Sequence, residues 1–209
     1  MIKGVCMKTR CVKLFLLFGC SVITHCLFAQ QANDTALNVS TISSFQFQHI
    51  TPTETNTAKI SISNKPLQLF IFLSPECPLS KNYTVTLNKL FQQYNNQVDF
   101  YGCISGKGFA TSEIQSFITT YKILFPVFVD VPEKFTHYIN AAVTPEVILL
   151  NKNGELVYKG AIDDWVEDLG KQKLTVSKHY LQDAINASLN NKEVMVKRTK
   201  AIGCMINDY

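Results

Sequence analysis

The sequence has 209 residues, of which 46% are hydrophobic and 17% charged, and its formal net charge is +4. A chain of this length and composition can bury one good-sized core, so we expect a single folded domain. Four of the 20 Lys and Arg residues lie in the first 29 residues, and the remaining 16 equal the 16 Asp and Glu residues in number. The remainder is formally neutral and has no basic excess of the kind that binds nucleic acid, so we expect no nucleic acid among its partners.

The N-terminal segment has the pattern of a secretory leader. Residues 1–29 begin with basic residues, contain no acidic residue, and continue as the apolar stretch LFLLFGCSVITHCLFA over 14–29. That stretch contains His25 and is shorter than the roughly 20 apolar residues that span a bilayer. We therefore predict a signal peptide cleaved near Ala29 and a periplasmic or secreted protein, which would contact a membrane only through an uncleaved leader.

The cysteines are too few for a disulfide scaffold. Four of the seven would leave with the leader: Cys6, Cys11, Cys20 and Cys26. Three thiols remain, at Cys77, Cys103 and Cys204, and they allow one internal disulfide in three alternative pairings. A redox role must therefore be argued for each cysteine separately.

A polar segment precedes the first regular patterns. Residues 30–43 (QQANDTALNVSTIS) are polar and aperiodic, which is typical of a short tether. Residues 44–50 (SFQFQHI) alternate apolar and polar side chains, which predicts an added strand at the start of a domain spanning 44–209. Residues 67–73 (LQLFIFL) form a continuous apolar run, typical of a strand buried on both faces.

Strands and helices then alternate along the chain. Directly after Cys77-Pro78, apolar residues recur at helical spacing from Leu79 to Tyr94, which predicts an amphipathic helix. The further expected elements are a strand at 97–105, a helix at 114–121, strands at 126–130 and 146–151, a hairpin strand at 155–160 and a last helix at 177–190. This order predicts an α/β fold with helices on both faces of the sheet.

Cys77 lies where such folds build their sites. It follows the carboxyl end of the 67–73 strand, and right-handed crossovers place the ends of neighbouring parallel strands side by side. Because Pro78 suits the first position of a helix, Cys77 is the expected N-cap. There the helix dipole and free N–H groups lower the pKa of a cysteine and favour the nucleophilic thiolate.

The residue that usually closes a Cys-x-x-Cys disulfide is replaced here by Ser80. We expect Ser80 to donate a hydrogen bond to the thiolate, but it cannot form a disulfide. A partner must come from Cys103, near the end of the neighbouring strand, or from Cys204, in the tail segment AIGCMI. The residues alone leave both alternatives open.

Four segments together resemble the thioredoxin-like superfamily, and specifically secreted redoxin-domain proteins of the alkyl hydroperoxide reductase and thiol-specific antioxidant type with a single-cysteine CPxS site. They are SPECPLS at 74–80, VTPEVILL at 143–150, NGELVYKGAIDD at 153–164 and IGC at 202–204. The resemblance implies a thioredoxin-like fold, with a central mixed sheet and helices on both faces.

The resemblance also implies roles for individual residues. It implies a cis Thr144-Pro145 bond that faces Cys77, with the Thr144 backbone able to pair with an extended substrate segment. It favours Cys204 over Cys103 as the partner of Cys77, because Cys204 falls on a motif position. The predicted catalytic residues are therefore Cys77, Cys204, Ser80, Thr144 and Pro145. For Asp163 and Asp164 we expect a solvated turn.

The resulting hypothesis is a thiol-disulfide oxidoreductase that acts on protein or small-molecule thiols and disulfides and needs no cofactor. One alternative is a peroxiredoxin-like peroxidase acting on peroxides, with Ser74 as the hydroxyl and Arg198 as the sole arginine after the leader. Another is a non-enzymatic copper-binding protein, in which Cys77, Cys204 and His137 would have to converge.

Overall fold

The structure, a computed structural model, describes residues 37–60 and 63–206. The predicted leader at 1–29 lies outside the described residues, as does the first part of the predicted tether. Within the described ranges, no helix is long and apolar enough to cross a bilayer.

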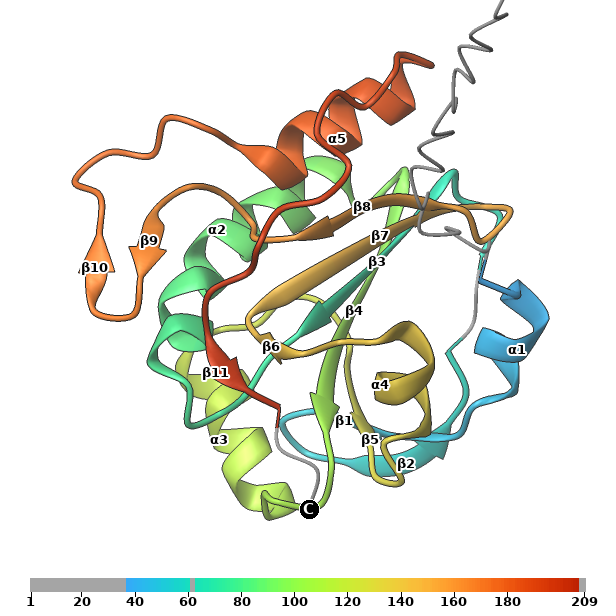
Figure 1. Cartoon of the computed structure of the whole chain (residues 1–209). Coiled ribbons are helices and arrows are strands. Elements are labelled where there is room, and N and C mark those ends of the chain that lie inside the picture. The colour runs from blue at the N-terminus through green and yellow to red at the C-terminus, as the bar shows by residue number, and fades with distance from the viewer. Residues whose placement is uncertain (1–36, 61–62, 207–209) are drawn as a thin grey trace, which may run out of the picture. The chain divides into compact units, whose positions relative to one another are not determined.

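The centre of the fold is a seven-stranded mixed sheet in the order β2-β1-β5-β4-β3-β7-β8 (Figure 1). β3, β4 and β5 run parallel, while β7, β8, β1 and β2 pair antiparallel with their neighbours. The predicted α/β architecture with a mixed sheet is confirmed. The strands are β1 (Phe47–Ile50), β2 (Thr55–Ala58), β3 (Leu67–Phe72), β4 (Val98–Ser105), β5 (Val127–Asp130), β7 (Glu146–Asn151) and β8 (Leu156–Gly160).

Helices cover both faces of this sheet (Figure 1). α2 (Pro78–Tyr94), α3 (Thr111–Thr120) and α5 (Tyr180–Leu189) pack on one face, and α1 (Val39–Ser44) and α4 (Lys134–Ile139) on the other. β3 supplies both cores, because its side chains alternate: Leu69 and Ile71 face the first group of helices, Phe70 and Phe72 the second. Burial of each such side chain contributes about 1.5–3 kcal/mol, so β3 stabilises the cores on both faces of the sheet.

The tether prediction for 30–43 is wrong in its second half. Asn38 caps α1 by accepting hydrogen bonds from the backbone N–H groups of Ser40 and Thr41. Ile42 is fully buried and packs in the core cluster that contains Phe135. A six-residue helix with the sequence VSTISS is too short and too polar to show a helical repeat of apolar residues, so its sequence did not predict it.

Four very short strands were also not predicted. β6 (Val143–Thr144) pairs with β11 (Cys204–Met205), and β9 (Val166–Asp168) pairs with β10 (Lys171–Gln172). Strands of two or three residues are too short for an alternating pattern to be recognised. The β6–β11 pair joins the middle of the chain to its C-terminal tail.

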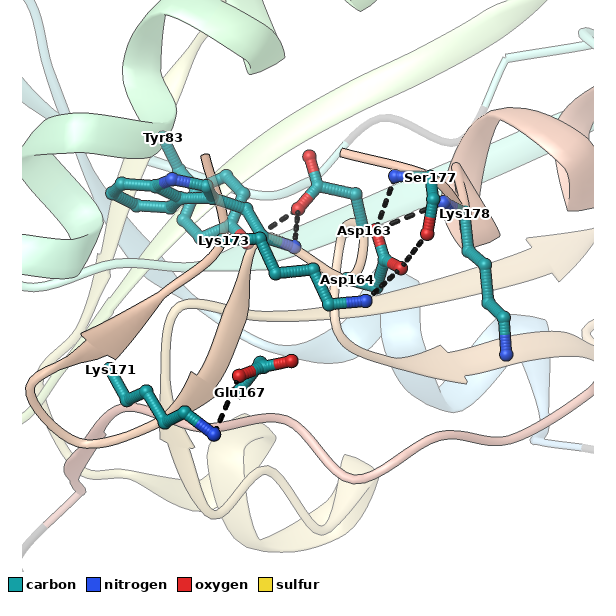
Figure 2. Close-up of polar contacts among 9 residues, drawn as sticks. Tyr83, Asp163, Asp164, Glu167, Lys171, Lys173, Ser177 and Lys178 are labelled. Carbon is teal, nitrogen blue, oxygen red and sulfur yellow. Dashed lines mark hydrogen bonds and ion pairs between the residues drawn. The ribbon is translucent and has the colours of Figure 1, made fainter. Parts of the chain in front are cut away.

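The Asp163-Asp164 segment is a buried connector rather than the solvated turn that we expected (Figure 2). The side chains of Asp163 and Asp164 are 5% and 7% exposed. Asp163 accepts a hydrogen bond from the Tyr83 hydroxyl at 2.6 Å and so ties the end of β8 to α2. Burial and the neighbouring Asp163 carboxylate raise the pKa of Tyr83, so this hydroxyl remains a donor.

Asp164 holds the segments on either side of the β9–β10 hairpin together (Figure 2). Its carboxylate accepts from the Lys173 ammonium and the Ser177 hydroxyl, both at 2.6 Å, and from the backbone N–H groups of Ser177 and Lys178. α5 begins at Tyr180 rather than at the predicted Ser177, and the N–H groups of Ser177 and Lys178 belong to the preceding connection, where they donate to Asp164.

We expect Asp164→Asn to lower the melting temperature at pH 7. The Lys173 ammonium, the Ser177 hydroxyl and two backbone N–H groups hold the pKa of Asp164 below its ordinary value. Its contribution to stability is therefore complete above about pH 4, the pKa of an unfolded Asp, and is lost as the pH falls below it. Thermal unfolding from about pH 5 downward should show a smaller loss of melting temperature in the variant than in the wild type.

Glu167→Gln is the matched control, because the Glu167–Lys171 ion pair at 2.9 Å lies in the same hairpin but is exposed. Exposed pairs contribute little, so this variant should unfold like the wild type. Equal acid sensitivity of the Asp164→Asn variant and the wild type would contradict the role assigned to Asp164.

Candidate active site

Cys77 is the N-cap of α2, as predicted, and Pro78 is the first helical residue. The loop that joins β3 to the helix is closed by hydrogen bonds to Ser74: the N–H of Cys77 donates to its carbonyl at 3.2 Å, and the N–H of Glu76 to its hydroxyl at 3.3 Å. The Cys77 side chain is only 1% exposed. The turn therefore directs the sulfur inward, at the positive end of a 17-residue helix.

Ser80 acts on Cys77 through its backbone. Its hydroxyl, fully buried, accepts a hydrogen bond from the Ser74 N–H at 3.2 Å and stabilises the loop. The backbone N–H of Ser80 is one of the donors that lower the pKa of Cys77. Donation by the free N–H groups at the start of the helix was expected, whereas the expected donation by the Ser80 hydroxyl is not seen, because that hydroxyl is bonded to Ser74.

The Thr144-Pro145 peptide bond is cis and lies beside Cys77. The Cys77 thiol donates to the Thr144 carbonyl oxygen, with 3.0 Å between the sulfur and the oxygen. Thr144 is the second residue of β6 and its side chain is buried. The backbone of β6 thus forms one wall of the space around the sulfur.

Cys204 reaches the same space from the C-terminal tail. β11 runs antiparallel to β6, with Cys204 opposite Thr144 and Met205 opposite Val143 (Figure 1). This pairing places the Cys204 thiol in contact with Cys77, with the two sulfurs 2.6 Å apart. Both cysteines are free thiols. The tail is the element that the sequence could not place, and the two-residue ladder is what positions it.

The two thiols have pKa values shifted in opposite directions. Burial raises the pKa of Cys77, but hydrogen bonds from the Cys204 thiol, the backbone N–H groups of Ser80 and Cys204, and the Thr144 side chain outweigh it, and the pKa lies below its ordinary value. Burial and the adjacent Cys77 raise the pKa of Cys204 to about 11. Cys77 is therefore the thiol that ionises first, and Cys204 is its proton-bearing neighbour.

Cys103, the other open candidate for a partner, lies elsewhere. It sits opposite Phe72 near the end of β4, as expected, but its side chain is 1% exposed and packs in the core beneath α1 and α4. Its sulfur lies 3.7 Å from the Tyr101 carbonyl oxygen, and burial raises the pKa of this thiol well above its ordinary value. Of the two candidates, the structure brings only Cys204 to Cys77.

A cavity of about 290 Å³ adjoins both sulfurs. Its walls include Phe109, Thr144, Met205 and Ile206, so one side is formed by the tail itself. The cavity has room for a side chain or a small thiol next to the reactive atoms. Opening it further would require the tail to move.

The positions of the described residues fit the two alternative functions, copper binding and peroxide reduction, less well. Within the described ranges, no three His, Cys, Asp or Glu side chains lie close enough to share a metal ion, so the Cu(I) site of Cys77, Cys204 and His137 does not form in this arrangement. For the peroxidase alternative, Ser74 does line the cavity. Arg198 does not: its backbone forms an isolated parallel β-bridge with Lys159 of β8, and it is not part of the cavity wall.

Solved structures share this fold. An uncharacterised conserved protein from Geobacillus kaustophilus is 20% identical, with a TM-score of 0.70 over 80% of this chain and 90% of that one. A hypothetical protein from Sinorhizobium meliloti is 23% identical, with a TM-score of 0.67 over 78% and 91% of the two chains. A thioredoxin-like protein in its oxidised form is 18% identical, with a TM-score of 0.51 over 65% and 88%. At these identities the likeness shows the thioredoxin-like fold.

No curated protein sequence matches the chain. A model of the redoxin family does match it, over residues 31–172, which is more than half of the chain and includes β3, the N-terminus of α2 and the Thr144-Pro145 bond. The match ends before β11, so it does not cover Cys204. On its fold and on this match, the chain belongs to the redoxin family.

Proposed function

We propose that the protein is a thiol-disulfide oxidoreductase in which Cys77 is the nucleophile and Cys204 the resolving thiol. The observation that carries the proposal is the pair itself: two free thiols in contact, 2.6 Å apart, one with a lowered and the other with a raised pKa. A nucleophile with a lowered pKa beside a thiol that keeps its proton is the arrangement that exchange through a mixed disulfide needs.

The reaction proceeds in two exchanges. The Cys77 thiolate attacks one sulfur of a substrate disulfide, forming a Cys77–substrate disulfide and releasing the other substrate sulfur as a thiolate, which takes up a proton. Cys204 then loses its proton and attacks the Cys77 sulfur, which forms the Cys77–Cys204 disulfide and releases the second substrate thiol. The substrate disulfide is reduced to two thiols, and an external dithiol regenerates the protein; the reverse sequence oxidises a substrate dithiol.

The other predicted site residues have supporting roles. Ser80 lowers the pKa of Cys77 through its N–H, and its hydroxyl fixes the loop. The Thr144 carbonyl orients the thiol, and Pro145 follows it in a buried position. We place the protein in the periplasm or outside the cell, where disulfides persist, because residues 1–29 have the pattern of a secretory leader.

Two substitutions separate the nucleophile from the resolving thiol. Cys77→Ser should reduce the rate of disulfide exchange with insulin to near the uncatalysed background, because burial raises the pKa of Cys204, the one thiol that remains at the site, and keeps it protonated. Cys204→Ser should still attack but should accumulate the Cys77–substrate disulfide, detected as a mass increase under non-reducing conditions. Exchange that persists in Cys77→Ser would refute the proposal.

The lowered pKa of Cys77 can be measured as the pH midpoint of its alkylation by iodoacetamide, followed on the Cys77 peptide by mass spectrometry. In Cys204→Ala the thiol that donates to Cys77 is absent, so the midpoint should rise toward the ordinary cysteine value of about 8.5. Cys204→Ser keeps a donor and should fall between the wild type and the Ala variant. Identical midpoints in the three proteins would show that Cys204 does not stabilise the thiolate.

Cys103→Ala should leave the exchange rate unchanged and lower the stability, by about 1 kcal/mol, because it removes a buried sulfur from a packed core. Urea unfolding and the insulin assay on the same preparation measure the two effects. A large loss of exchange without unfolding would mean that Cys103 takes part in the chemistry.

A further inference from the structure

The C-terminal tail covers the edge of β6. Among the described strands β11 is the only partner of β6, and the N–H of Ile206 extends the pairing by donating to the Ala142 carbonyl at 3.0 Å. The Thr144 hydroxyl also approaches the Cys204 carbonyl at 3.5 Å. The backbone next to Cys77 is therefore occupied by a strand of the protein itself.

The tail has a firm attachment upstream of this strand. The N–H of Lys159 in β8 donates to the Lys197 carbonyl at 3.0 Å, and the N–H of Thr199 donates to the Lys159 carbonyl at 3.0 Å. The Thr199 hydroxyl accepts from the N–H of Ala161 and is hydrogen-bonded to Tyr158. The chain is thus anchored at Thr199, and β11 begins five residues later.

By contrast, β11 itself is held weakly. It has two residues, and the Met205 side chain is 69% exposed. A short ladder with little buried apolar surface lies at the low end of local stability and opens without unfolding of the domain. The anchor at Thr199 can therefore remain in place while β11 leaves and returns.

Gly203 makes the close approach of the tail to β6 possible. A Cβ at this position would lie 2.1 Å from the Thr144 carbonyl oxygen and 2.6 Å from the carbonyl carbon. These are backbone atoms beside the reactive sulfur and cannot swing away as a flexible side chain would. Any side chain at position 203 must therefore displace the tail.

We propose that the tail is an internal competitor for an extended polypeptide substrate, whose cysteine-containing segment pairs with Val143 and Thr144 in the place of β11. The inference rests on the proposed function, because it concerns what approaches Cys77. The positions of Gly203 and Cys204 define the substrate: an extended segment with its cysteine opposite Thr144 and a small residue before it. Main-chain pairing supplies the affinity, so the substrate class is unfolded or loop segments of proteins rather than small thiols.

In this arrangement, the return of β11 both resolves the Cys77–substrate disulfide and releases the product. While the substrate occupies β6, Cys204 is displaced and the Cys77–substrate disulfide persists. When β11 returns, it takes the backbone positions of the substrate strand and brings the Cys204 sulfur to Cys77. The Cys77–Cys204 bond forms, the Cys77–substrate bond breaks, and the substrate leaves as a thiol that has also lost its strand partner.

The test compares Gly203→Ala and Gly170→Ala, each combined with Cys204→Ser so that Cys77 is the only reactive thiol. Gly170 is the matched control, because a Cβ there meets no atom within 4 Å and its positive φ makes the substitution locally strained without touching the site. The first probe is the peptide Ala-Ile-Gly-Cys-Met-Ile, with its cysteine disulfide-linked to 2-nitro-5-thiobenzoate. The second is N-acetylcysteine linked in the same way, and release of the coloured thiol gives the rate.

We expect Gly203→Ala to raise the ratio of peptide rate to small-probe rate by about tenfold over Cys204→Ser alone, because the displaced tail no longer competes for β6. A peptide with Ala in place of Gly should lose most of this advantage, and Gly170→Ala should leave the ratio unchanged. Hydrogen exchange of the Ile206 amide reports the tail directly and should accelerate only in Gly203→Ala.

The outcomes that overturn the inference differ from those that overturn the proposed function. An unchanged rate ratio, whether or not the Ile206 amide exchanges faster, shows that the tail does not compete with a strand. In that case Cys77 still reacts with both probes and the oxidoreductase proposal stands. If Cys77 reacts with neither probe in any of the three proteins, the proposed function itself fails.

Discussion

The site depends on the close contacts of one atom, the Cys77 sulfur. It lies 3.0 Å from the Thr144 carbonyl oxygen and 2.6 Å from the Cys204 sulfur. Three separate parts of the chain meet there: the N-terminus of α2, the end of β6, and the tail. The long apolar strand β3 fixes the first of them, because it is buried on both faces and ends directly before the Cys77 loop. The sheet therefore serves as a rigid base for a contact that is made by a helix N-cap and two very short strands outside it.

Opposing effects act on the Cys77 sulfur. Burial and the Thr144 carbonyl, which accepts the thiol proton, favour the neutral form. The Ser80 and Cys204 N–H groups and the Cys204 thiol favour the thiolate, and together with the helix N-terminus they prevail. Two of these donors belong to the tail. The ionisation of the nucleophile is therefore coupled to the position of β11.

The sequence was sufficient for the elements that have long hydrophobic patterns. The apolar run of β3 and the helical spacing after Pro78 located both sides of the Cys77 loop, and the strand order that follows from them gave the fold. The helix α1 was missed because its six residues, VSTISS, are too few and too polar for a helical repeat of apolar residues to be recognised. Asp164 was expected in solvent because nothing in its neighbours' identities shows that Lys173, Ser177 and Lys178 converge on it across a hairpin.

Within the site, the sequence could name the residues but not their contacts. The N–H of Ser80 acts on Cys77 as expected, but its hydroxyl accepts from the Ser74 N–H instead of donating to the thiolate, a distinction that depends on the rotation of one side chain. The choice between Cys103 and Cys204 depended on which face of β4 holds the Cys103 side chain and on a two-residue strand. Both are tertiary facts, set by packing against Phe70 and Phe72 and by the path of the tail.

The anchor at Thr199 also limits how far Cys204 can move when β11 is displaced. Cys204 follows Thr199 by five residues, and five extended residues span at most about 18 Å, so a displaced Cys204 remains within that radius of its attachment. Its local concentration near Cys77 is then in or above the millimolar range that short linkers give, far higher than that of a free thiol competing from solution. The length of this segment thus limits the lifetime of the Cys77–substrate disulfide, because it determines how soon Cys204 of the same molecule attacks it.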